Sequence, residues 1–153
     1  MERILYPGSF RPFHEGHLEK VDAVSRLYPD CLFIFAVSCH CARSNISTID
    51  AAQIIDLSLK DKGIEAQIIP VKRSILSAKV LKEKDISVVM TGSQSTLKAL
   101  RLLSITGYWK GEIVQLNNIG IHATQIRYMM ENNDLGWKQY LTPSAVSFLE
   151  SKM

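Results

Sequence analysis

The residues best suited to bind a ligand or to catalyse a reaction are two histidines separated by two positions. His14 and His17 follow a short apolar segment, residues 4–6, and a turn that contains glycine and proline. If both histidines lie in the first turn of a helix, they share one face and can donate hydrogen bonds to the same phosphate. Gly8 and Gly16 allow the backbone to approach a ligand closely, and a helix N-terminus presents free N–H groups to an anion. The spacing therefore favours a polyphosphate site, although an isolated pair of histidines more often has a surface or capping role.

Two segments of the chain resemble the signatures of one enzyme superfamily. The segment from Gly8 to His17 reads GSFRPFHEGH and resembles the GxFxPxHxGH signature of the nucleotidyltransferases. This superfamily includes mononucleotide adenylyltransferases and cytidylyltransferases. Its second signature, ISxTxIR, is expected near the C-terminus, and residues 121–127 read IHATQIR. The two motifs occur in the expected order, and the resemblance covers nearly the whole chain.

The resemblance implies transfer of a nucleotide from a nucleoside triphosphate to an acceptor, with release of pyrophosphate. This reaction depends on hydrogen-bond donors and positive charge rather than on a covalent nucleophile. By its place in the signature, His17 would bind the α-phosphate, and His14 would bind the α- or β-phosphate beside it. Arg127 would bind the leaving phosphates through the N–H donors of its positively charged, planar guanidinium. We therefore expect His14, His17 and Arg127 to be the catalytic residues.

The expected nucleotide-binding residues come from the two motifs and from two loops. Ser9 and Phe10 offer backbone N–H groups, and Thr124 offers a hydroxyl at a helix N-terminus. Arg43 stands in the loop after the second strand, where relatives carry a basic residue, and a surface arginine is the competing interpretation. The full expected set is Gly8, Ser9, Phe10, Gly16, Arg43, Gly92, His122, Thr124 and Ile126. The resemblance implies Mg²⁺ with ATP, held mainly by phosphate oxygens and water, so no dedicated metal site is expected.

Four residues depart from the pattern of the superfamily. Arg11 stands where relatives have Asp or Gln, so we expect it to contact the acceptor. His122 and Ala123 replace small hydroxyl residues of the second motif, and Ala52 stands where relatives often have Arg. These departures motivate an alternative from another functional class, a nucleotide-binding module that has lost catalysis.

The choice of acceptor depends on weaker similarities. The HxGH form of the first motif, the GSQS turn at residues 92–95 and the WKQYLTP segment at residues 137–143 resemble pyridine mononucleotide adenylyltransferases. We therefore predict transfer of AMP from ATP to nicotinamide or nicotinate mononucleotide. Residues 6–10 resemble phosphopantetheine adenylyltransferase instead. A cytidylyltransferase acting on a small phosphate ester is the remaining enzyme alternative.

Composition limits the other functional classes. A chain of 153 residues with 46% hydrophobic content fits one domain, residues 1–153. The net charge of +3 is spread along the chain without a long basic run, so a nucleic-acid partner is not expected. No apolar stretch approaches the roughly 18 residues of a membrane span, so we expect a cytoplasmic protein. Relatives often assemble, and a homo-oligomer is expected by resemblance alone.

The three cysteines do not suggest a disulfide framework or a zinc site. Their number is odd, and two of them stand in the triplet Cys39-His40-Cys41. A structural zinc site needs four ligands, and the sequence has no second cluster of Cys or His to complete one. We expect small buried thiols at the end of a strand.

The elements that must position these residues follow from alternating apolar runs and helical patterns. The expected strands are residues 4–6, 31–38, 66–71, 86–91 and 112–116. The expected helices are residues 16–27, Ser47 or Thr48 to Gly63, one starting at Ser74 or Ser77, one after residues 92–95, one from Thr124, and one from Thr142-Pro143.

Together these elements predict an α/β fold, a single-domain Rossmann-like open parallel sheet of about five strands. The expected strand order is 3-2-1-4-5, with helices on both faces. Ligands of such sheets bind at the carboxyl ends of the strands, where the winding direction reverses. The two motifs should therefore meet at that point.

Overall fold

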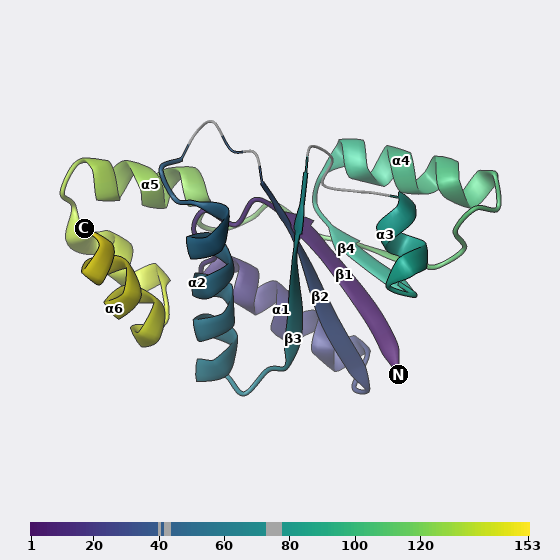
Figure 1. Cartoon of the computed structure of the whole chain (residues 1–153), viewed down its shortest axis with the longest axis horizontal. Coiled ribbons are helices and arrows are strands. Elements are labelled where there is room, and N and C mark those ends of the chain that lie inside the picture. Colours follow the sequence, from purple (N-terminus) through teal and green to yellow (C-terminus); the bar gives the residue numbers. More distant parts are fainter. Residues whose placement is uncertain (40, 42–43, 73–77) are drawn as a thin grey trace.

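The computed structural model describes residues 1–153 except residues 40, 42–43 and 73–77 (Figure 1). Its strands are β1 (Glu2–Gly8), β2 (Cys31–Ser38), β3 (Ala66–Val71), β4 (Val88–Thr91) and β5 (Glu112–Gln115). Its helices are α1 (Glu15–Leu27), α2 (Thr48–Asp61), α3 (Ala78–Glu83), α4 (Gln94–Ile105), α5 (Ala123–Glu131) and α6 (Pro143–Lys152). A 3₁₀-helix, η1 (Leu135–Tyr140), connects α5 to α6.

The described strands form one parallel sheet in the order β3-β2-β1-β4-β5, which confirms the predicted order. β1 lies at the centre and pairs with β2 on one side and with β4 on the other. The winding direction therefore reverses between β1 and β4. A crevice at the carboxyl ends of these two strands is the expected ligand position in such a sheet.

Alternate residues of each strand pack against opposite faces of the sheet. In β1, Ile4 and Tyr6 belong to one hydrophobic cluster, and Leu5 between them belongs to the other. The larger cluster includes buried residues of α1, α2, α5, η1 and α6, and the smaller one includes residues of α3 and α4. Figure 1 shows α3 and α4 on the side of the sheet opposite to α1, α2 and α6. The prediction of helices on both faces is thus confirmed.

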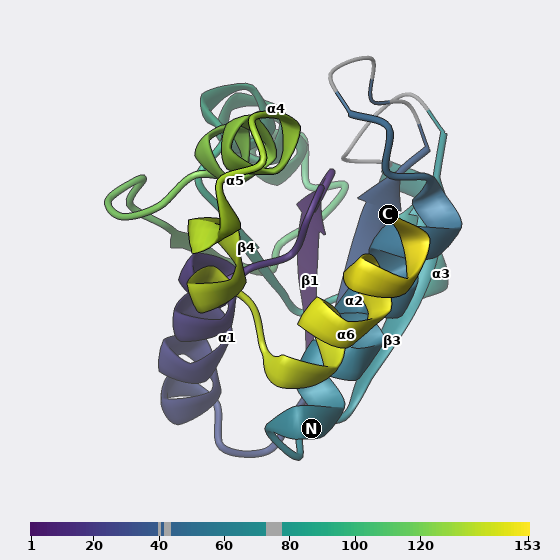
Figure 2. The same cartoon turned by 90° about the vertical axis from the view of Figure 1, so that its left-hand side faces the viewer.

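The helix starts follow capping chemistry at some sites and tertiary contacts at others. Ser47 Oγ accepts a hydrogen bond of 3.1 Å from the Asp50 N–H and so caps α2, as predicted. The predicted cap of α6 differs, because the Thr142 side chain makes no capping hydrogen bond. Instead, a carboxylate oxygen of Asp61 accepts a bond of 2.6 Å from Ser144 Oγ. This contact fixes α6 beside α2, and Figure 2 shows the two helices side by side. The predicted starts at Ser74 and Ser77 lie outside the described residues.

Two expectations about burial were wrong. The helical spacing of Leu18, Val21, Val24 and Leu27 predicts one buried stripe on the helix at residues 16–27, but Leu27 is 66% exposed. The thiols of the CHC triplet were expected to be buried, but Cys39 is exposed and Cys41 is half-buried. Both lie beyond the last residue of β2. His40 lies outside the described residues.

No helix in the described part of the chain is long and apolar enough to cross a membrane.

Candidate active site

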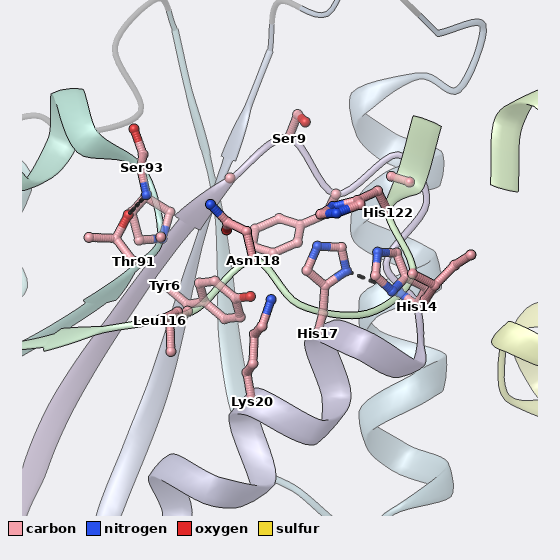
Figure 3. A pocket seen from close by; sticks show the side chains of 16 residues that line it. Tyr6, Ser9, His14, His17, Lys20, Thr91, Ser93, Leu116, Asn118 and His122 are labelled. Carbon is pink, nitrogen blue, oxygen red and sulfur yellow. Dashed lines mark hydrogen bonds between the residues drawn. The ribbon is translucent and has the colours of Figure 1, made fainter. Parts of the chain in front are cut away.

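A cavity of about 400 Å³ opens where the chain leaves β1 and β4 (Figure 3). It therefore lies at the predicted reversal of the sheet. Both sequence motifs contribute to its wall, and so do the ends of β4 and β5. The lining residues are Tyr6, Pro7, Gly8, Ser9, Phe10, His14, His17, Lys20, Thr91, Gly92, Ser93, Leu116, Asn118, Ile121, His122 and Ala123.

The two histidines of the first motif cap α1 and face the cavity at the same time. His14 is the N-cap residue, and its Nδ1 accepts a hydrogen bond of 3.0 Å from the Gly16 N–H. His17 Nδ1 accepts a bond of 3.1 Å from the His14 N–H. Because both Nδ1 atoms act as acceptors, a neutral ring carries its proton on Nε2. The capping role allowed by the spacing is therefore present, and it leaves each Nε2–H as a donor for a ligand.

Aromatic rings hold His17 in place. The Phe13 ring stacks on the His17 ring at 5.3 Å between centroids and an interplanar angle of 16°. Phe10 meets His17 edge-on at 5.1 Å, and the His14 ring lies 3.8 Å away. These contacts leave the His17 imidazole little freedom to rotate. The site thus presents a pre-positioned donor and does not have to order it when a ligand arrives.

Burial keeps both imidazoles neutral. Burial, together with the smaller effects of the nearby charges of Lys20 and His122, lowers the pKa of His14 to about 4. Burial also lowers the pKa of His17 well below its ordinary value, with added contributions from His14, Lys20 and His122. At neutral pH both rings are therefore hydrogen-bond donors through Nε2 and not cations.

Acidification from neutral pH to about pH 5 is expected to lower the free energy of unfolding by about 2 kcal/mol through His14 alone. The folded-state pKa of His14 is about 4 and lies below the unfolded value of 6.5. The unfolded chain therefore binds the proton first, and the stabilisation present above pH 6.5 is lost as the pH falls toward 4. Urea unfolding as a function of pH measures this loss. Asparagine at position 14 keeps a capping oxygen but does not titrate, so His14→Asn should flatten the profile. An unchanged slope in that variant would contradict the assignment.

The second motif reaches the cavity through its first three residues. Ile121, His122 and Ala123 line the cavity beside the first motif, so the two motifs meet as predicted. The His122 N–H donates to Gln125 Oε1 at 2.9 Å and fixes the start of α5. The expected nucleotide contact of Ile126 is not supported, because its side chain is 0% exposed within the core.

Arg11 and Arg127 bind protein oxygens outside the cavity wall. Arg11 is 2% exposed and donates to the Ser9 carbonyl at 2.7 Å and to the Ile46 carbonyl at 2.9 Å. Its third nitrogen donates to Thr48 Oγ1 at 2.9 Å. The expected contact of Arg11 with the acceptor is not supported, because all three nitrogens already have protein partners. The Arg127 guanidinium donates to the Arg11 carbonyl at 2.7 Å.

One further predicted site residue does not line the cavity either. Thr124 is exposed, and its hydroxyl accepts a hydrogen bond of 3.2 Å from Arg127. Arg43 lies outside the described residues.

The chain is similar to known proteins in sequence and in fold. The chain is 24% identical over 157 residues to nicotinamide-nucleotide adenylyltransferase 1 of Sulfolobus acidocaldarius, covering 96% of this chain and 88% of that protein. No protein-family model matches the chain. The chain is nucleotidyltransferase-like in sequence and fold.

Two solved structures illustrate the likeness of the fold. Thermotoga maritima TmcAL bound with alpha-thio ATP has a TM-score of 0.74 and 16% identity, covering 99% of this chain and 56% of that one. A bifunctional NMN adenylyltransferase/ADP ribose pyrophosphatase from Francisella tularensis has a TM-score of 0.69 and 17% identity, covering 92% of this chain and 44% of that one. The nucleotidyltransferase-like chain thus spans about half the length of each solved protein.

Two glycines at this site make room for protein rings. A Cβ on Gly16 would lie 2.8 Å from Cε1 of His14, and one on Gly8 would lie 2.9 Å from Cζ of Phe10. Both distances are too short for stable contact. We had expected these glycines to admit a ligand, but their first role here is to admit the side chains that form the pocket.

The sequence motifs do not include several residues that line the cavity. Lys20 lies three positions after His17, so helical spacing could have placed both on one face. Thr91 ends β4, and its hydroxyl accepts a hydrogen bond of 3.1 Å from the Ser93 N–H. Asn118 follows β5 and faces the cavity from a loop (Figure 3). No short motif signals that contribution.

Proposed function

We propose that this protein transfers AMP from ATP to nicotinamide mononucleotide and releases pyrophosphate. The observation that carries the proposal is the pair of neutral imidazoles whose Nε2 donors face a cavity at the reversal of a parallel sheet. Similarity to the Sulfolobus acidocaldarius enzyme along 96% of the chain supports both the reaction and this acceptor. Nicotinate mononucleotide is the nearest alternative acceptor, followed by phosphopantetheine and small phosphate esters.

In this reaction, a phosphate oxygen of the acceptor attacks the α-phosphorus of ATP. A new P–O bond forms as the bond from the α-phosphorus to the bridging oxygen breaks, and pyrophosphate leaves with the electron pair. His17 Nε2–H would donate to an oxygen of the α-phosphate as negative charge grows on it, and His14 would hold the neighbouring phosphate. Neither ring needs to transfer its proton. Such pre-positioned donors typically contribute about 10² to 10³ in rate each.

Mg²⁺ is proposed to enter with ATP. The lining residues include no carboxylate, and the described residues hold no cluster of three or more side chains suited to bind a metal. This donor set fits a cation that is held by phosphate oxygens and water rather than by a protein cage. When bound, Mg²⁺ would neutralise charge on the leaving phosphates.

A catalytically silent nucleotide-binding module is the second candidate. It is favoured by the arrangement of Arg127, whose guanidinium is bonded to the Arg11 carbonyl and to Thr124 and does not line the cavity. The replacement of small hydroxyl residues by His122 and Ala123 points the same way.

Pyrophosphate release in the presence of Mg²⁺ tests the proposal. ATP and CTP are each combined with nicotinamide mononucleotide, nicotinate mononucleotide, phosphopantetheine or glycerol 3-phosphate, and the product is identified by mass. We expect release with ATP and nicotinamide mononucleotide and formation of the dinucleotide. ATP binding without pyrophosphate release from any pair would favour the silent module. Absence of ATP binding would overturn both candidates.

The proposed partners are thus ATP and a phosphorylated small molecule. A cytoplasmic location and assembly into a homo-oligomer stay predictions from the resemblance to the superfamily.

A further inference from the structure

Lys20 directs its ammonium group into the cavity although it belongs to neither sequence motif. It lies on α1 one helical turn after His17, and it lines the same wall. Figure 3 shows its side chain rising from α1 between Tyr6 and His17, with the nitrogen toward the cavity. Side chains of a helix lean toward its N-terminus, so the stem of Lys20 reaches back toward His17. The direction therefore follows from the helix itself.

No carboxylate in the cavity balances this charge. None of the lining residues is Asp or Glu. Within the described part of the chain, Lys20 forms no ion pair, since the pairs found involve other residues. The acidic residues Glu15, Glu19 and Asp22 of α1 line a different cavity, on the far side of the helix. The ammonium thus faces the cavity without an anionic partner.

The position of Lys20 on α1 increases the need for an anion. It reaches toward the helix N-terminus, where the macrodipole is positive and a cation is unfavourable. Its neighbours there are His17, His14 and His122, which supply no negative charge. A half-buried ammonium in these surroundings is satisfied by an anion that enters the cavity.

We propose that Lys20 is a phosphate-binding residue of this site and that its ammonium contacts phosphate oxygens of the bound nucleotide beside His17. The identity of the nucleotide rests on the proposed function, but the affinity for polyphosphate does not. The two neutral imidazoles would donate directional hydrogen bonds to the phosphate, and Lys20 would provide the positive charge that they lack.

Two substitutions at this position separate charge from shape. Lys20→Met keeps a long stem and removes the charge, and Lys20→Arg keeps the charge. Lys98→Met is the matched control, because Lys98 is exposed on α4 and does not line the cavity. Calorimetry measures binding of inorganic tripolyphosphate and of ATP to the intact chain. We expect Lys20→Met to weaken tripolyphosphate binding about 10- to 100-fold, the range of one charged hydrogen bond. The Lys20→Arg and Lys98→Met variants should stay within about threefold of the wild type.

The melting temperature without ligand shows whether Lys20→Met acts through folding. It should remain unchanged or rise, because the variant removes a cation from the positive end of a helix. Tripolyphosphate binding by Lys20→Met equal to that of the wild type would overturn the inference, even if AMP transfer is observed. Conversely, Lys20-dependent binding of tripolyphosphate without any AMP transfer would overturn the proposed function and support this inference. A wild-type chain that binds neither ATP nor tripolyphosphate would overturn both.

Discussion

Replacement of His17 by asparagine is expected to lower the rate constant of AMP transfer by about 10² to 10³. The side-chain oxygen of asparagine can take the place of Nδ1 and still accept from the His14 N–H, so the cap of α1 is retained. The side chain is too short to supply a donor at the position of Nε2. Steady-state kinetics should therefore show a large loss of kcat, and calorimetry should show a much smaller loss of ATP affinity.

Glutamine at position 17 provides the complementary control. Its amide reaches farther and can donate near the position of Nε2, so His17→Gln should retain more activity than His17→Asn. The melting temperatures of both variants test whether loss of the stacking between Phe13 and His17 affects folding. A His17→Asn variant whose kcat stays within a few-fold of the wild type would refute the assigned role.

Replacement of Arg11 by methionine is expected to lower the free energy of unfolding by about 2 to 4 kcal/mol. Arg11 is 2% exposed, and it bonds to carbonyls of Ser9 and Ile46 and to the hydroxyl of Thr48. Methionine fills similar space but removes the donors of these partly buried acceptors. Urea denaturation measures the change. The same variant should lose activity, because Arg11 joins the first motif to the start of α2.

A surface arginine calibrates that effect. Arg26 has a side chain that is 79% exposed and pairs only with Asp22, so Arg26→Met should change the stability by less than about 0.5 kcal/mol. The free energy of unfolding of Arg11→Lys should lie between those of the wild type and Arg11→Met, since an ammonium cannot reach three separate oxygens as the planar guanidinium does. Equal stabilities of Arg11→Met and Arg26→Met would show that the buried hydrogen bonds contribute nothing.

The sheet could be predicted from sequence because its determinants are local. β2 is a continuous apolar run, as expected for a central parallel strand covered on both faces, and the intervening helices allow neighbouring strands to be parallel. The positions of His14 and His17 were predicted for the same reason. Their spacing, the preceding strand and the following helix are all contained in one short segment.

The role of Arg11 could not be predicted, because it depends on distant residues. A charged residue in a turn is usually solvated, and the partners that bury this one lie 35 and 37 positions away. The contacts of Ile126 and Arg127 also depend on distant residues. The motif places them beside Thr124, but the helix turns Ile126 into the core and lets Arg127 bond to a carbonyl 116 positions away. Lys20 belongs to neither motif, and only its helical spacing from His17 could have placed it at the cavity that it lines.

The hydrogen bond between Arg127 and the Arg11 carbonyl has a consequence for folding during synthesis on the ribosome. All five strands have been synthesised by Gln115, so the sheet can pair before α5 leaves the exit tunnel. Ile121, His122 and Ala123, which line the cavity, are synthesised later. Arg127, whose guanidinium connects α5 to the first motif, is synthesised later still. A nascent chain therefore acquires the strands of the sheet first and completes the wall of the cavity last. A stalled product that ends at Gln115 contains these strands but lacks the part of the wall formed by Ile121, His122 and Ala123.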